Sequence, residues 1–148
     1  RSVIGEFVNG RLEPGVHNAT WTEFCARFGI NARRRIMLAG LKEALVNLRD
    51  AGCKRIYIDG SFVTEKSEPG DYDAAWDMDG VELGRLDQVF LVFTHGNREQ
   101  KSRYMGEFFP MSAIEETSGQ QYLDFFQSDA EMPGRKGIVM IDLGGSLD

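Results

Sequence analysis

Apolar residues recur at helical spacing in the first third of the chain. Leucines fall three or four residues apart and predict a helix over residues 31–51. Ahead of it, residues 20–23 (Thr-Trp-Thr-Glu) have the form of a capping box, in which a threonine and a glutamate satisfy each other's backbone amides. We therefore expect a shorter helix that begins after Thr20 and ends at Gly29.

The hydrophobic period then changes from helical to extended. Three strands are predicted from alternating or β-branched residues: 55–59, 71–77 and 137–143. Residues 1–19 contain turn signals and no period, so we expect an irregular N-terminal segment. Residues 86–128 stand before the last strand as an insertion, in which helices are expected over 95–109 and 119–127.

Composition and charge narrow the class of protein. The chain has 148 residues and a net charge of −6, which disfavours a protein that coats nucleic acid by bulk charge. No stretch approaches the roughly 20 apolar residues of a membrane span, and the start lacks the pattern of a secretion signal. Cys25 and Cys53 show no zinc-ligand spacing to His17 or His95, and we interpret them as free thiols. We expect one cytoplasmic α/β (α+β) domain over residues 1–148.

One group of residues has the chemistry of a phosphoryl-transfer site. Gly60-Ser61 follows a predicted strand, and after nine intervening residues come Asp71 and Asp73. Side chains at i and i+2 of a strand share a face, so these two carboxylates favour a cation between them, for which Mg²⁺ or Mn²⁺ is suited. A glycine lets a phosphate approach the backbone, the Ser61 hydroxyl can donate to it, and Lys66 adds a positive charge.

These residues resemble a known family. The run 57–64, followed by Lys66, Pro69-Gly70 and the two aspartates, resembles the polymerase-β-like nucleotidyltransferase superfamily. More narrowly, the chain is similar to small bacterial nucleotidyltransferase-like proteins. That narrower likeness extends over most of the chain and includes Thr20-Trp21, Phe24, Phe28-Gly29, Asn31, Arg33-Arg34-Arg35, Ala51-Gly52-Cys53, residues 135–139 and Ile141-Asp142.

The resemblance implies a mixed sheet flanked by helices and the transfer of a nucleoside monophosphate from an NTP, expected to be ATP, to a hydroxyl. It places metal at Asp71 and Asp73 and the triphosphate at Gly60 and Ser61. Members usually have a third carboxylate on a later strand, for which we prefer Asp142 as metal ligand or base.

Alternatives remain open for the third carboxylate and for the function. Asp77 shares the face of the aspartate pair, but it lies six residues along the strand from Asp71, about 20 Å at strand rise. The resemblance also implies a bacterial toxin–antitoxin or defence module, with a cognate toxin protein or a tRNA as acceptor. The rival function is an inactive nucleotide-binding partner protein, such as an antitoxin.

The expected roles of several other charged residues follow only from their positions in the sequence. We expect Asp59 to point away from the site and to form a salt bridge. Residues 33–35 (three arginines) are interpreted as a solvated stretch, with a phosphate contact as the alternative. The cations from Arg98 to Arg103 are interpreted as a solvated helix face or an acceptor-binding patch, and Arg135-Lys136 as a turn or a phosphate contact.

Overall fold

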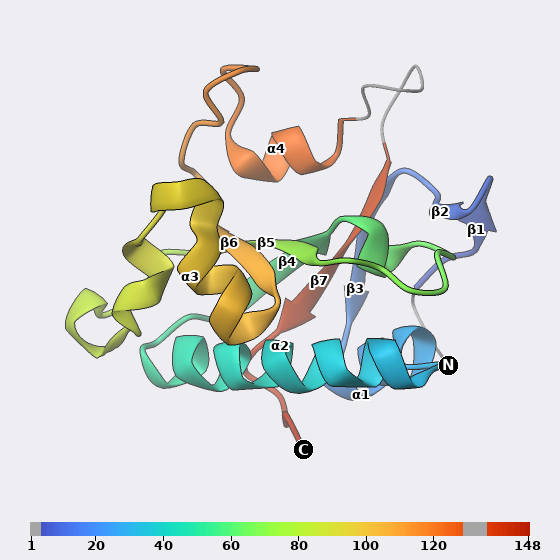
Figure 1. Cartoon of the computed structure of the whole chain (residues 1–148), viewed down its shortest axis with the longest axis horizontal. Coiled ribbons are helices and arrows are strands. Elements are labelled where there is room, and N and C mark those ends of the chain that lie inside the picture. The colour runs from blue at the N-terminus through green and yellow to red at the C-terminus, as the bar shows by residue number, and fades with distance from the viewer. Residues whose placement is uncertain (1–3, 129–135) are drawn as a thin grey trace.

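The computed structural model describes residues 4–128 and 136–148 and shows an α+β fold (Figure 1). The strands are β1 (Phe7–Val8), β2 (Arg11–Leu12), β3 (Gly15–Ala19), β4 (Arg55–Asp59), β5 (Tyr72–Trp76), β6 (Gly106–Pro110) and β7 (Gly137–Asp142). The α-helices are α1 (Trp21–Phe28), α2 (Ala32–Asp50), α3 (Thr94–Tyr104) and α4 (Tyr122–Phe126). The expected fold class, a mixed sheet flanked by helices, is therefore confirmed.

The main sheet has the strand order β3-β7-β4-β5-β6, and β1 and β2 form a separate hairpin. β4 is antiparallel to both of its neighbours, while β3 runs parallel to β7 and β6 parallel to β5. A short 3-10 turn, Ser61–Val63, follows β4 and begins the connection to β5. This connection holds the glycine–serine pair next to the aspartates.

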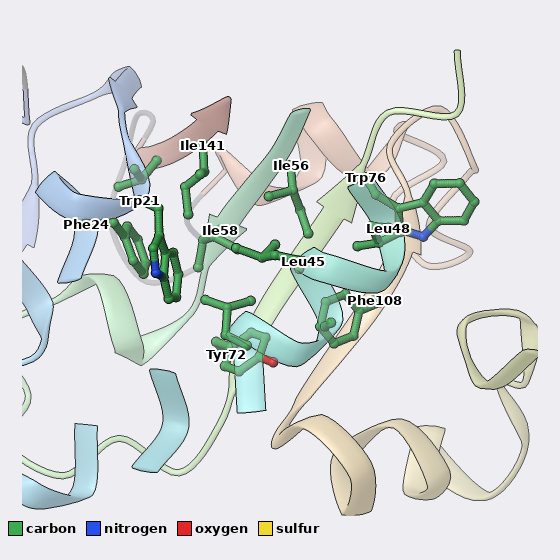
Figure 2. Packing of buried hydrophobic residues seen from close by; sticks show 14 of the residues in the cluster. Trp21, Phe24, Leu45, Leu48, Ile56, Ile58, Tyr72, Trp76, Phe108 and Ile141 are labelled. Carbon is green, nitrogen blue, oxygen red and sulfur yellow. The ribbon is translucent and has the colours of Figure 1, made fainter. Parts of the chain in front are cut away.

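The two faces of the sheet are covered differently. The long helix α2 lies below the sheet in Figure 1 and α4 lies above it. Figure 2 shows the α2 side, where leucines of α2 pack against alternate residues of β4, β5 and β6 such as Ile58, Tyr72 and Phe108. On the α4 side, Phe126 packs with Tyr57 and neighbouring sheet residues in a second, smaller cluster.

The two N-terminal helices form where the sequence predicts them. Thr20 and Glu23 make both hydrogen bonds of the capping box at the start of α1, at 3.1 and 2.8 Å. Asn31 caps α2 by accepting from the backbone N–H of Arg34. Each of these helices therefore begins at a side chain that accepts a hydrogen bond from a backbone N–H without a partner in the helix.

Two sequence-based expectations are wrong. The segment 1–19 is not irregular, because it contains the hairpin and the edge strand β3. The expected helix over 95–109 ends at Tyr104, and β6 follows as a strand of the main sheet within the segment 86–128. β3 and β6 are stabilised by partners distant in sequence, β7 and β5 respectively, so local periodicity does not reveal them.

The expected helix over 119–127 is present but shorter, as α4. Within the described ranges, no helix combines the length and the apolar character that crossing a membrane requires.

Candidate functional site

The loop between β4 and β5 is held by the N-terminal turn of α2. Arg34 is buried, and its guanidinium donates to the carbonyl oxygens of Phe62, Thr64 and Lys66 at 2.6, 2.8 and 2.6 Å. Arg33 donates to the carbonyl oxygens of Pro69 and Gly70 at 3.1 and 2.8 Å. These arginines are therefore neither a solvated stretch nor free to contact phosphate, because backbone carbonyls occupy them.

Gly60 brings the turn directly against β5. Its backbone has φ +93° and ψ −175°, a conformation that is essentially restricted to glycine. A Cβ at this position would lie 3.3 Å from both the backbone nitrogen and Oδ2 of Asp73. The glycine–serine turn and Asp73 are thus immediate neighbours, as the motif predicts.

Three carboxylates form a row across adjacent strands on the α4 face. Asp59 of β4 pairs with Asp73 of β5, and Asp73 pairs with Glu107 of β6. Cross-strand partners point to the same face of a sheet, so the three side chains lie side by side. We call Asp59, Asp73 and Glu107 the carboxylate row. Asp71, just before β5, adds a fourth negative charge that acts on Asp73.

The outer members of the row have cationic partners. Lys136 Nζ lies 3.2 Å from Asp59 Oδ1, and Lys101 Nζ lies 3.2 Å from Glu107 Oε1. Asn97 donates to Glu107 Oε2 at 2.7 Å. Asn97 is the last of three consecutive left-handed residues, 95–97, that interrupt α3, and such strained backbone is common at functional sites.

Asp73 differs electrostatically from its neighbours. No described residue donates a hydrogen bond or forms an ion pair with its carboxylate. Burial, followed by the negative charges of Asp59, Glu107 and Asp71, raises the pKa of Asp73 from 3.8 to about 7, although Lys136 opposes this. Burial also raises the pKa of Asp59, against the charge of Lys136. Asp73 is therefore the carboxylate of the row whose pKa a bound cation would lower most.

The row opens into a pocket of about 600 Å³. All three carboxylates and Lys136 line it, together with aromatic residues of β6 and α4 such as Phe109 and Tyr122. The pocket thus combines acidic groups, one lysine and aromatic surface, which is a composition able to hold a metal-bound phosphate next to a planar ring.

Asp142 and Asp77 do not join this group. Asp142 is the cross-strand partner of Arg55, four residues along β4 from Asp59, or about 13 Å at strand rise. It is exposed and accepts a hydrogen bond from the backbone of Gly144. Asp77 lies at the same distant end and forms an ion pair of 3.3 Å with Arg55. The structure therefore places Glu107, rather than either aspartate, beside Asp73.

Of the other predicted site residues, some lie where we expect them and others do not. Ser61 is half-buried at the start of the 3-10 turn, and Asp71 lies beside Asp73, as expected. The side chain of Lys66 is exposed. Its backbone carbonyl oxygen accepts a hydrogen bond from Arg34. Asp59 forms the expected salt bridge, but it lines the pocket instead of pointing away from it.

The proposed basic patch on α3 is largely neutralised. Lys101 pairs with Glu107, and Arg103 pairs with Asp87 at 2.9 Å. Arg98 is exposed. Arg135 lies outside the described residues, whereas Lys136 lines the pocket.

Sequence reasoning missed Glu107, Asn97 and the role of Asp59. Glu107 was hidden because the polar residues before it predicted a helix that continued to Pro110. The sequence Gly106-Glu107-Phe108-Phe109-Pro110 does carry a strand signal, since two aromatics stand before a strand-ending proline.

Comparison with protein families identifies the family of the chain, but the family has no known activity. Residues 6–142 match the model of a family described as a family of unknown function (DUF6932). The chain belongs to this family. No curated protein and no solved structure matches the chain. The DUF6932 match includes the whole carboxylate row, the glycine–serine turn and Lys136.

Proposed function

We propose that this protein transfers a nucleoside monophosphate from an NTP to an acceptor hydroxyl, with Mg²⁺ as cofactor. The observation that supports this most directly is the contact between Gly60 and Asp73, with Glu107 in register on the next strand. This arrangement puts a phosphate-compatible turn beside carboxylates that can share a cation, which is the pairing that nucleotidyl transfer needs.

The residues fit Mg²⁺ as a partner of substrate phosphates. All donors are carboxylate oxygens, and Asp73 is the unpartnered carboxylate between two others. Mg²⁺ is commonly held by one or two carboxylates, while substrate phosphates and water complete its coordination. We assign this role to Asp71 and Asp73. The bound ion would supply charge neutralisation at the phosphates.

The remaining residues bind and orient the substrate. Gly60 and Ser61 face the phosphates with backbone and hydroxyl donors, and Lys136 exchanges its contact with Asp59 for one with the triphosphate. The acceptor oxygen forms a bond to the α-phosphorus, the bond from that phosphorus to the bridging oxygen breaks, and pyrophosphate leaves. The hydroxyl proton passes to Glu107 and then to water.

A second candidate function is nucleotide binding without transfer, as in an inactive partner protein. One observation favours it: among the described residues, no three histidine, cysteine, aspartate or glutamate side chains converge as a ready metal site. The two candidates share the pocket and differ in whether a product forms.

A label-transfer experiment distinguishes them. The purified protein is incubated with α-labelled ATP and Mg²⁺, with itself, bacterial protein extract or total tRNA as acceptor. We expect label in at least one fraction, and a loss of about 100-fold in Asp73→Asn and Glu107→Gln. Asp142→Asn is the matched control at the distant end of the sheet and should retain activity within about twofold.

Calorimetric titration with ATP is run on the same samples. Intact ATP binding with no label in any fraction would reject transfer in favour of the second candidate. A loss in Asp142→Asn equal to that in Asp73→Asn would reject the assignment of the site to the carboxylate row.

A further inference from the structure

A second hollow adjoins the carboxylate pocket and differs from it in chemistry. It has a volume of about 480 Å³ and shares Phe109, Glu115 and Tyr122 with the first pocket. Phe93, Ile114 and Glu116 are among its further lining residues. We call this hollow the aromatic groove. Because these three shared residues line both hollows, a ligand in the groove lies next to the proposed reaction centre.

The groove presents a stack of aromatic rings to solvent. The ring of Phe109 is nearly parallel to those of Tyr122 and Phe93, with centroids 4.1 and 6.0 Å away. Phe93 is 44% exposed and Ile114 is 54% exposed, although both are large apolar side chains. Exposed apolar residues gathered in one hollow, rather than scattered, indicate a surface that binds another molecule.

The charge of the groove limits what that molecule is. Its described lining contains two glutamates, Glu115 and Glu116, and no lysine, arginine or histidine. Hydrogen bonds from the Thr117 hydroxyl, then from Ser118, lower the pKa of Glu115 to about 2, so this carboxylate stays ionised at neutral pH. A phosphate-rich ligand would be repelled here, whereas a cationic one would be attracted.

We propose that the aromatic groove binds a polypeptide segment in which an apolar or aromatic side chain is flanked by lysine or arginine. As the acceptor of the transfer, such a segment would present a serine hydroxyl to the neighbouring carboxylate pocket. The acceptor role rests on the proposed function, but binding in the groove does not. The groove therefore favours a protein acceptor over a tRNA.

Binding is tested without ATP or Mg²⁺, so the result does not depend on transfer. The probe is a fluorescein-labelled peptide with Phe-Ser between pairs of lysines, and the matched probe has glutamates in place of the lysines. Fluorescence anisotropy at low salt should show the basic peptide binding at least about 10-fold more tightly than the acidic one. Labelled total tRNA is the third probe and should not compete.

Variants locate the binding. Phe93→Ala and Glu116→Lys should each lower the affinity for the basic peptide by about 10-fold. Glu116→Lys should also raise the affinity for the acidic peptide. Leu83→Ala and Glu82→Lys change exposed residues outside the groove and should leave affinity unchanged. Circular dichroism confirms that each variant is folded.

Three outcomes would overturn the proposal. The first is the absence of basic-peptide binding up to about 1 mM. The second is equal binding by Phe93→Ala, Glu116→Lys and their controls. The third is tRNA binding that the same two variants abolish, which would assign the groove to RNA. Peptide binding without label transfer would instead leave the groove intact and reject only the proposed function.

Discussion

Asp59 and Asp73 are direct cross-strand partners, and among the described residues Lys136 forms its ion pair with Asp59 rather than with Asp73. A buried and a half-buried carboxylate at adjacent strand positions disfavour each other's charge, and the lysine forms its ion pair with only the first of them. Asp73 is left as the group whose protonation responds to whatever enters the pocket. Because of this asymmetry, the protonation of Asp73 can be followed in the protein without ligand.

The first prediction concerns stability against pH. Because the pKa of Asp73 is about 7 in the folded protein and 3.8 is its ordinary value, the folded state holds this proton more tightly than the unfolded state. Its contribution is fully present below about pH 4 and is lost as pH rises through about 7. Asp73→Asn, which mimics the neutral form, should therefore be more stable than the parent at pH 8 by about 2 kcal/mol.

Urea unfolding at pH 5 and pH 8 measures this difference. The matched control is Asp79→Asn, which removes the same charge from an exposed side chain. An identical pH slope for Asp73→Asn and the parent protein would show that Asp73 is ionised normally.

The second prediction concerns Gly60. Gly60→Ala must place a methyl group in a backbone region closed to alanine and within 3.3 Å of Asp73, so it should cost about 1–3 kcal/mol of unfolding free energy. Gly70→Ala is the matched control, because no heavy atom lies within 4 Å of the added Cβ. Thermal unfolding of both variants tests the contrast, and equal melting temperatures would count against the strained turn.

The third prediction concerns Arg34. Arg34→Met removes the donors to the carbonyl oxygens of three loop residues and should cost at least about 3 kcal/mol, because these buried acceptors lose their partner. Amide exchange should accelerate in residues 61–70 more than in the sheet. The control is Arg35→Met, since Arg35 is exposed; faster exchange in both variants would refute a specific role for Arg34.

The fourth prediction concerns thiol reactivity. Burial is the main cause that raises the pKa of Cys53 to about 11, and its Sγ donates to the carbonyl oxygens of Arg55 and Asp77. Cys53 should therefore react with a disulfide reagent at pH 8 at least about 10-fold more slowly than half-buried Cys25. Titration of Cys25→Ser and Cys53→Ser isolates each thiol, and urea should abolish the difference. A fast phase from Cys53 in the native protein would contradict its burial.

The helices and central strands were predictable because their signals are local. The capping box of Thr20 and Glu23 is satisfied within four residues, and the leucines of α2 carry their own period. The neighbourhood of Gly60, Asp71 and Asp73 was predictable because β4 and β5 are joined by one short connection, so their register follows from the chain.

The third carboxylate was not predictable in this way. Asp142 was favoured because it ends an apolar strand, yet the antiparallel pairing of β4 and β7 carries it to the opposite end of the sheet. Glu107 reaches Asp73 through a parallel pairing between residues 34 positions apart in sequence, which no local pattern encodes. Arg34 was likewise read as a surface charge, because sequence does not show which carbonyl groups lack partners.

The placement of β3 also governs how the molecule is assembled. Gly15 pairs with Gly137, and β7 lies between β3 and β4 in the sheet. On the ribosome, β3 is the first strand of the main sheet to emerge, and its partner β7 is synthesised only after β4, β5 and β6. A nascent chain that stalls before β7 thus leaves unpaired the edges of β3 and β4 that β7 joins, and the sheet is completed only when β7 has emerged.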